Sequence, residues 1–252
     1  KPHRVKLPCL GWIRTSDKRI PNGKFCYATI SHGTDGRYYV SICYEKEVPD
    51  VETIKQSVEK TIGLDYKSDG LFMDSNGHAE DIPHFYREAQ RKRTKLQRRL
   101  SKKRGSRKGE RKSTNFLKQL RKVNRQSMHI ANQRKDYLHK LSTEIANRYD
   151  AVCVEDLDMK AMSNKGFGNG KATMDNGYGM FQNMLSYKLK ERGKNLSVVD
   201  KWYPSSQLCH CCGHRQPMPL KIRVYQCHEC GMVCDRDWNA AINIKMEGFR
   251  LL

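Results

Sequence analysis

The chain has 252 residues, of which 37% are hydrophobic and 30% are charged, enough for one large domain or two smaller ones with real cores. Its 48 Lys and Arg against 27 Asp and Glu leave a formal net charge of +21. This excess predicts a polyanionic partner and favours nucleic acid over an anionic membrane. No window reaches the ~18 apolar residues of a membrane span and no signal peptide is recognisable, which predicts a cytoplasmic protein. The chain begins at Lys1 without an initiator Met, as a piece of a longer protein would.

Residues 1–56 are predicted to form part of a β-domain. Two runs rich in β-branched and aromatic residues, 24–30 and 37–43, flank a turn at Gly33–Gly36, which is typical of a hairpin. A hairpin and one preceding strand cannot close a barrel or bury much surface alone. We therefore expect other strands of the same β-domain to come from elsewhere in a longer chain.

Residues 57–203 alternate between strand and helix patterns, which predicts an α/β domain with a central mixed sheet. Residues 61–65 begin a meander of three short strands, and residues 83–149 form a basic helical insertion of two helices. The remaining elements are predicted, in chain order, as a strand at 151–155, a loop rich in Gly and Asn at 163–179, a helix at 180–192, a strand at 196–199 and a final helix at 238–246.

The helical insertion carries most of the net charge of the chain. Residues 91–125 contain 17 Lys and Arg and a single acid, Glu110. Their one aromatic residue is Phe116, so we expect contacts with phosphates rather than stacking on bases. A solvated helix face is the alternative, but like-charge repulsion at this density favours a bound polyanion. The predicted nucleic-acid-binding residues are Arg91, Lys92, Arg93, Lys95, Arg98, Arg99, Lys102, Lys103 and Arg104.

Six of the ten cysteines fall within 26 residues, from Cys209 to Cys234, which favours a metal site over disulfides. Two Cys-x2-Cys-Gly knuckles are separated by 14 residues, and each Gly supplies the positive φ of a tight turn. They predict a zinc ribbon over residues 204–234 with a closed, structural metal. The predicted ligands are Cys209, Cys212, Cys227 and Cys230.

Other ligands of the same ribbon remain open alternatives, although their spacing is less regular. They are Cys211, Cys234, His210, His214 and His228. The four scattered cysteines are predicted to be ordinary reduced and buried thiols. They are Cys9, Cys26, Cys43 and Cys153.

Three carboxylates stand where strands end or a helix begins. Asp65 and Glu155 each end a hydrophobic strand, and Asp237 opens the last helix. Carboxylates that converge at one sheet edge would repel one another unless divalent cations neutralise them, and two Mg²⁺ ions could then support phosphodiester cleavage. Asp65 could instead end a strand at a turn, and Asp237 could be a helix N-cap. Glu155 is harder to explain structurally, because it ends an apolar strand where an unpaired charge is costly.

Several segments together resemble the TnpB (OrfB) family of transposon-encoded nucleases, which are related to the type V CRISPR effectors. The similarity covers nearly the whole chain. The segments are Thr61–Asp65, Val154–Leu157, Ser205-Ser206-Gln207 before the first knuckle, His129–Arg134, and the string Asp235–Ile244, which reads DRDWNAAINI.

The resemblance implies a RuvC-like nuclease (an RNase H-like mixed sheet), with Asp65, Glu155 and Asp237 as the Mg²⁺-binding catalytic acids. The family pattern selects Asp237 over its rival Asp235. Residues 1–56 would belong to a partial wedge β-barrel, and residues 57–203 to the nuclease domain. Residues 163–179 would be a lid beside the active site, for which a plain surface loop is the alternative. Residues 204–234 would be the zinc ribbon and 235–252 the final nuclease segment.

These inferences predict an RNA-guided, Mg²⁺-dependent DNA endonuclease that uses two metals, with guide RNA and target DNA as partners and a nucleoid-associated location. The family's helical recognition region and early wedge strands are not found in this sequence, so a truncated or minimal form is expected. A non-cleaving RNA- or DNA-binding derivative of the same fold, such as a repressor, is the alternative. A zinc-ribbon protein of transcription or translation is a weaker one, because it leaves the acids unexplained.

Overall fold

The computed structural model describes residues 3–17, 22–47, 52–103, 112–164, 170–219 and 221–252. The chain divides into two compact units. One contains Lys1–Asp50 and Lys92–Met128, and the other contains Val51–Arg91 and His129–Leu252. Within the described residues, no helix combines the length and the apolar character needed to span a membrane.

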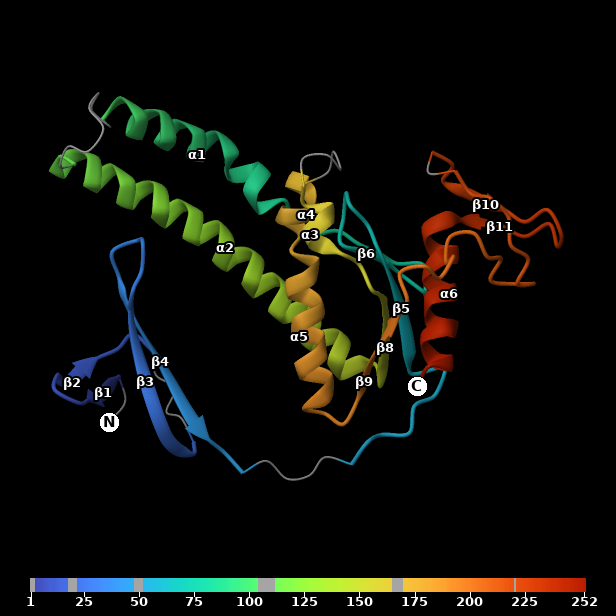
Figure 1. Cartoon of the computed structure of the whole chain (residues 1–252), viewed down its shortest axis with the longest axis horizontal. Helices are drawn as coiled ribbons and strands as arrows, with labels where there is room; N and C mark the ends of the chain where they lie inside the picture. The colour runs from blue at the N-terminus through green and yellow to red at the C-terminus, as the bar shows by residue number, and fades with distance from the viewer. Residues whose placement is uncertain (1–2, 18–21, 48–51, 104–111, 165–169, 220) are drawn as a thin grey trace. The chain divides into compact units, whose positions relative to one another are not determined.

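The first unit contains two antiparallel hairpins, the C-terminal part of one long helix and the N-terminal part of the next. The predicted hairpin is confirmed, with a bulge near Phe25 and a tip that contacts α2, where Asn124 Nδ2 donates to the Thr34 carbonyl at 2.7 Å. Gln119 of α2 donates to the Leu96 carbonyl of α1 at 3.0 Å, so the helices lie side by side here (Figure 1). The elements are β1 (Arg4–Leu7), β2 (Gly11–Arg14), β3 (Lys24–His32), β4 (Tyr38–Glu45), α1 (Phe85–Lys102) and α2 (Thr114–Arg148).

The prediction of four buried scattered thiols is wrong for three of them. Cys153 is buried, but Cys9, Cys26 and Cys43 are exposed. Each exposed cysteine lies on or between the strands of a two-stranded sheet, which has too few strands to bury its faces.

The second unit is built on the predicted mixed sheet, which the structure confirms. Its strand order is β7-β6-β5-β8-β9, in which β5, β8 and β9 are parallel and β6 and β7 run antiparallel to their neighbours. Apolar runs such as Val152-Cys153-Val154 are fully buried, as expected for central parallel strands covered on both faces. The strands are β5 (Thr61–Tyr66), β6 (Phe72–Asp74), β7 (Ala79–Glu80), β8 (Ala151–Glu155) and β9 (Asn195–Val199).

Helices cover both faces of this sheet (Figure 1). The C-terminal part of α2 and α5 (Tyr178–Lys190) bury Leu138, Phe181 and Leu185 in the main core on one face. Helix α6 (Arg236–Arg250) lies on the other face, where Ile244 packs against Cys153.

The close contact between α6 and the sheet requires glycine at two positions. A Cβ on Gly63 of β5 would lie 2.2 Å from the Ala241 carbonyl oxygen, and a Cβ on Gly248 would lie 2.5 Å from Cys153 Sγ. Both distances are well inside van der Waals contact. The two glycines therefore allow the middle and the C-terminal part of α6 to lie close against β5 and β8.

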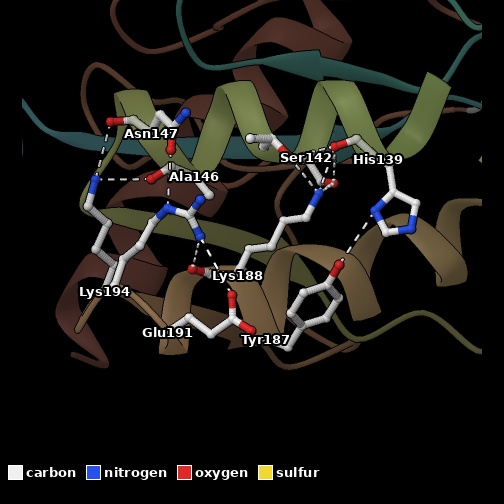
Figure 2. A network of polar contacts seen from close by, with 10 residues as sticks. His139, Ser142, Ala146, Asn147, Tyr187, Lys188, Glu191 and Lys194 are labelled. Atoms are coloured by element: carbon white, nitrogen blue, oxygen red, sulfur yellow. Dashed lines mark hydrogen bonds and ion pairs between the residues drawn. The ribbon is translucent and has the colours of Figure 1, made fainter. Parts of the chain in front are cut away.

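A buried lysine joins α5 to α2 on the opposite face (Figure 2). Lys188 is 6% exposed, and its Nζ donates to the His139 carbonyl at 2.6 Å and to the hydroxyls of Ser142 and Thr143 at 2.7 Å each. All three donor positions of the ammonium group thus have acceptors, and this offsets the cost of burying the charge.

Lys188→Met is expected to lower the free energy of unfolding by about 2 to 3 kcal/mol, because charged hydrogen bonds are lost and Ser142 loses a buried partner. Chemical denaturation followed by circular dichroism measures the change. Lys190→Met is the matched control, since Lys190 lies on the same helix and is exposed. Equal stabilities of the two variants would contradict this role for Lys188.

The predicted loop at 163–179 is only partly a loop. Residues 165–169 lie outside the described part of the chain, but Gly170–Asn176 form helix α4. Tertiary contacts hold this glycine- and asparagine-containing segment in place, because Asp175 Oδ1 accepts from Arg134 and from the Tyr86 backbone N–H, each at 3.2 Å. The remaining short elements are α3 (Met159–Met162), β10 (Val224–Gln226) and β11 (Val233–Asp235).

Candidate functional site: an acidic pocket beside a four-cysteine cluster

The three predicted acids line one pocket of about 700 Å³ in the second unit. Asp65 lies on β5 and Glu155 ends β8, and these strands are parallel neighbours with Leu64 opposite Val154. The two carboxylates therefore leave the sheet at the same edge. Asp237 comes from the first turn of α6. Further along, the same helix packs against β5 at Gly63. Residues far apart in the sequence thus meet at one place.

The helix cap at the start of α6 is Asp235, so the alternative that Asp237 is the N-cap is wrong. Asp235 Oδ1 accepts from the backbone N–H groups of Asp237 at 2.8 Å and Trp238 at 3.0 Å. An N-cap residue is the last residue with extended backbone before the helix, and Asp235 has φ −62° and ψ 136°. With the cap supplied by Asp235, the carboxylate of Asp237 remains available to the pocket.

Burial and mutual repulsion shape the electrostatics of the acids. Burial raises the pKa of Asp65 well above its usual range, and the charges of Glu155 and Asp237 raise it further. Burial also raises the pKa of Glu155, against the opposing hydrogen bond from Ser205 Oγ to Glu155 Oε1 at 2.6 Å. On the open side of the pocket, Arg223 lies 3.5 Å from Asp237 Oδ2. Acids whose pKa values are raised by burial and by neighbouring negative charges are typical of sites that hold cations.

Removing the charge of Asp65 is expected to stabilise the metal-free protein at neutral pH. An acid whose pKa is raised in the folded state keeps its proton there while the unfolded chain, with an ordinary pKa of 3.8, has lost it. Stability therefore falls as the pH rises from that value through the folded pKa. Asp65→Asn should melt above the wild type at about pH 8 without Mg²⁺, and the difference should shrink near pH 5.

The matched control is Asp69→Asn, because Asp69 is an exposed acid lining the same pocket. It should leave the melting curve nearly unchanged. The opposite result would be a wild type that melts above Asp65→Asn at about pH 8 in a chelating buffer. It would contradict the destabilising role of the Asp65 charge.

The four predicted cysteine ligands form a tight cluster. Their sulfur atoms all lie within 4.8 Å of one another, and Cys209–Cys230 and Cys212–Cys227 are each separated by 3.6 Å. A tetrahedral site with Zn–S bonds of about 2.3 Å places its sulfurs about 3.8 Å apart, so the cluster is compatible with structural zinc. Gly213 and Gly231 have the predicted positive φ, 74° and 72°.

In the part of the chain that the structure describes, no other group of three or more His, Cys, Asp or Glu is this compact. The three acids of the pocket are therefore spread more widely than the sulfurs.

Helix α6 also holds the segment that leads into the first knuckle. Asn239 and Asn243, one turn apart, donate to the Leu208 carbonyl at 2.6 and 2.7 Å. Asn243 also donates to the Ser205 carbonyl at 2.8 Å, and Asn239 Oδ1 accepts from the His210 backbone N–H at 3.0 Å. The helix that presents Asp237 thus also positions Ser205, the partner of Glu155.

The predicted nucleic-acid-binding residues lie on and just after α1. Those that the structure describes are exposed, except that Arg93 is half-buried, and Arg104 falls outside the described residues. The predicted lid segment contributes Thr173 to the pocket wall.

Sequence reasoning did not identify the cationic and aromatic side chains around the acids. The pocket is also lined by Lys67, Lys201, Trp202, Arg215, Arg223 and Arg236. A signal was present for some of them, because Lys201 and Trp202 lie just before the Ser205-Ser206-Gln207 segment. Lys67 and Arg236 likewise lie close in sequence to Asp65 and Asp237. Arg215 and Arg223 reach the pocket through the fold of the four-cysteine segment, which its sequence does not reveal.

Two family models match the chain. The model described as "Probable transposase" (OrfB_IS605) matches residues 41–165, and "Cas12f1-like, TNB domain" matches residues 178–244. A Streptomyces pristinaespiralis protein described as "Putative RNA-guided DNA endonuclease" is 36% identical over 87% of this chain and 52% of its own length. Escherichia coli K12 "Putative RNA-guided DNA endonuclease InsQ" is 31% identical over 99% of this chain and 63% of its own.

The fold is shared with a solved structure. A chain of the "Cas12f1-sgRNA-target DNA complex" superimposes with a TM-score of 0.58 at 20% identity, covering 88% of this chain and 45% of that one. The present chain thus spans about half the length of the relatives it matches. The two family models, the curated relatives and the motifs around Asp65, Glu155 and Asp237 agree: the chain belongs to the TnpB (OrfB) family.

Proposed function

We propose that the chain carries the catalytic part of an RNA-guided DNA endonuclease, in which Asp65, Glu155 and Asp237 hold Mg²⁺ and cleave phosphodiester bonds by a two-metal mechanism. The observation that carries the proposal is that acids from three distant segments line one pocket. The relatives named as RNA-guided DNA endonucleases support the class of activity.

The side chains of the pocket suit this chemistry. Carboxylate oxygens are preferred Mg²⁺ ligands, and bound Mg²⁺ would supply an activated water and stabilise the leaving oxygen. The hydrogen bond from Ser205 fixes the rotamer of Glu155. Arg223, 69% exposed beside Asp237, can exchange its carboxylate partner for a phosphate of the substrate.

The acids also favour cleavage over the alternative of a non-cleaving, nucleic-acid-binding derivative. Burial and repulsion raise the pKa of Asp65, so three charged acids here destabilise the fold unless cations bind. A protein that only bound nucleic acid would gain nothing from that cost.

We propose that the other parts of the chain bind the nucleic acid and support the site. The exposed Lys and Arg of α1 contact the phosphates of guide RNA and target DNA, residues 1–56 contribute to a wedge β-barrel, and residues 163–179 act as a lid. The four cysteines hold a structural Zn²⁺ ion.

The test is to purify the chain with its cellular RNA and assay cleavage of DNA matching that RNA, with and without Mg²⁺. Cutting that needs both the RNA and Mg²⁺ is expected. RNA and DNA binding without any cutting would favour the non-cleaving alternative. Cutting that is unchanged by ribonuclease treatment would contradict RNA guidance.

A further inference from the structure

Trp202 is the most exposed large hydrophobic side chain among the described residues, with 80% of its surface accessible. It lines the pocket that contains the three acids. A single exposed apolar residue is ordinary on a protein surface. An indole beside a pocket of acids and cations is a more specific arrangement, because its flat face can stack on a nucleobase.

The backbone holds Trp202 in a fixed turn at the end of β9. Its N–H donates to Asp200 Oδ1 at 2.7 Å, and the Tyr203 N–H donates to the Asp200 carbonyl at 2.9 Å. Tyr203 itself packs on the buried cluster of Cys153, Val199 and Ile244. The indole is thus presented by a turn that is anchored to the sheet.

The same turn leads directly to the catalytic acids. Three residues after Trp202, Ser205 donates to Glu155 at 2.6 Å. The position of Trp202 is therefore coupled to that of Glu155 through a short stretch of chain that contains Pro204.

The cationic side chains around the pocket complement the negative phosphates of a nucleic-acid strand. Lys201 Nζ lies 5.3 Å from the centre of the Trp202 ring. Together the cations can contact backbone phosphates while the indole contacts a base. The cationic side chains lining the pocket are Lys67, Lys201, Arg215, Arg223 and Arg236.

We infer that Trp202 is a positioning residue that stacks on a nucleobase of single-stranded DNA next to the phosphate that is cut. This inference rests on the proposed function. Inside a duplex both faces of each base are covered by the neighbouring base pairs, so we infer that the substrate enters this pocket as a single strand. Stacking fixes the strand's register relative to Asp65, Glu155 and Asp237.

The test compares short single-stranded DNA with an oligonucleotide of the same length whose bases are replaced by abasic sites. Binding is measured by fluorescence anisotropy in a Glu155→Gln background, which prevents cutting. The parent should bind the base-bearing strand about tenfold more tightly than the abasic one. Trp202→Leu should lose this preference, and Trp202→Phe should keep most of it.

Tyr187→Leu is the matched control, because Tyr187 is an exposed aromatic residue of α5 that does not line the pocket. A preference that survives Trp202→Leu, or absence of measurable binding by the parent, would overturn the stacking role. Cleavage by the wild type together with either result would leave the nuclease function standing. A Trp202-dependent preference without any cleavage would support stacking and contradict the nuclease.

Discussion

Replacing Asp65, Glu155 or Asp237 by its amide is expected to reduce Mg²⁺-dependent DNA cleavage about a thousandfold or more. Each amide keeps the shape of the side chain but removes a charged oxygen ligand, and loss of several kcal/mol of transition-state stabilisation gives a change of this size. DNA binding should be almost unchanged, because the exposed cations of α1 remain. Single-turnover cleavage and equilibrium binding, measured on the same preparations, separate the two effects.

Two neighbouring acids provide the controls for this experiment. Asp156 follows Glu155 and is exposed, so Asp156→Asn should cut at nearly the wild-type rate. Asp235→Asn should also retain cutting, because asparagine is as good an N-cap as aspartate. If Asp235→Asn were inactive and Asp237→Asn active, the assignment of the third ligand would be wrong.

Loss of the metal at the four cysteines is expected to unfold the segment around them. Structural zinc contributes ~10 to 16 kcal/mol of apparent binding energy in small zinc-binding folds. The segment has little other core, since its buried cluster centres on Cys209, Tyr225 and Cys227. Elemental analysis should find one zinc per chain in the wild type and almost none in Cys227→Ser, with a lower melting temperature.

Cys211→Ser is the matched control for the zinc site. Cys211 stands between two predicted ligands, but it is exposed and lies outside the cluster. It should keep full zinc content and the wild-type melting curve. Zinc loss in Cys211→Ser, or full zinc in Cys227→Ser, would show that the ligand set is wrong.

The sequence was informative where local pattern decides structure. The runs before Asp65 and Glu155 are short and mostly apolar, so their strands and the exit of both acids at one edge could be predicted. The spacing of the cysteines likewise predicts the cluster, because two Cys-x2-Cys turns suffice to bring four sulfurs together.

Other features depend on tertiary contacts that no local pattern encodes. Asp235 and Asp237 are equally good caps by residue type, and only the backbone of the folded chain assigns the cap to Asp235. Helix α4 contains glycine and asparagine, yet Arg134 holds its Asp175 in place. Trp202 lines the pocket because the turn after β9 leads into the segment whose Ser205 contacts Glu155.

The separation of the three acids along the chain has a consequence for protein synthesis. A ribosome that has made β5 and β8 has delivered two of the acids, but the pocket gains its third only when α6 is made. A product ending before Asp237 would carry the basic helices without the complete pocket. On the proposed function, such a product from an interrupted message would occupy nucleic acid without cutting it and would compete with the intact enzyme.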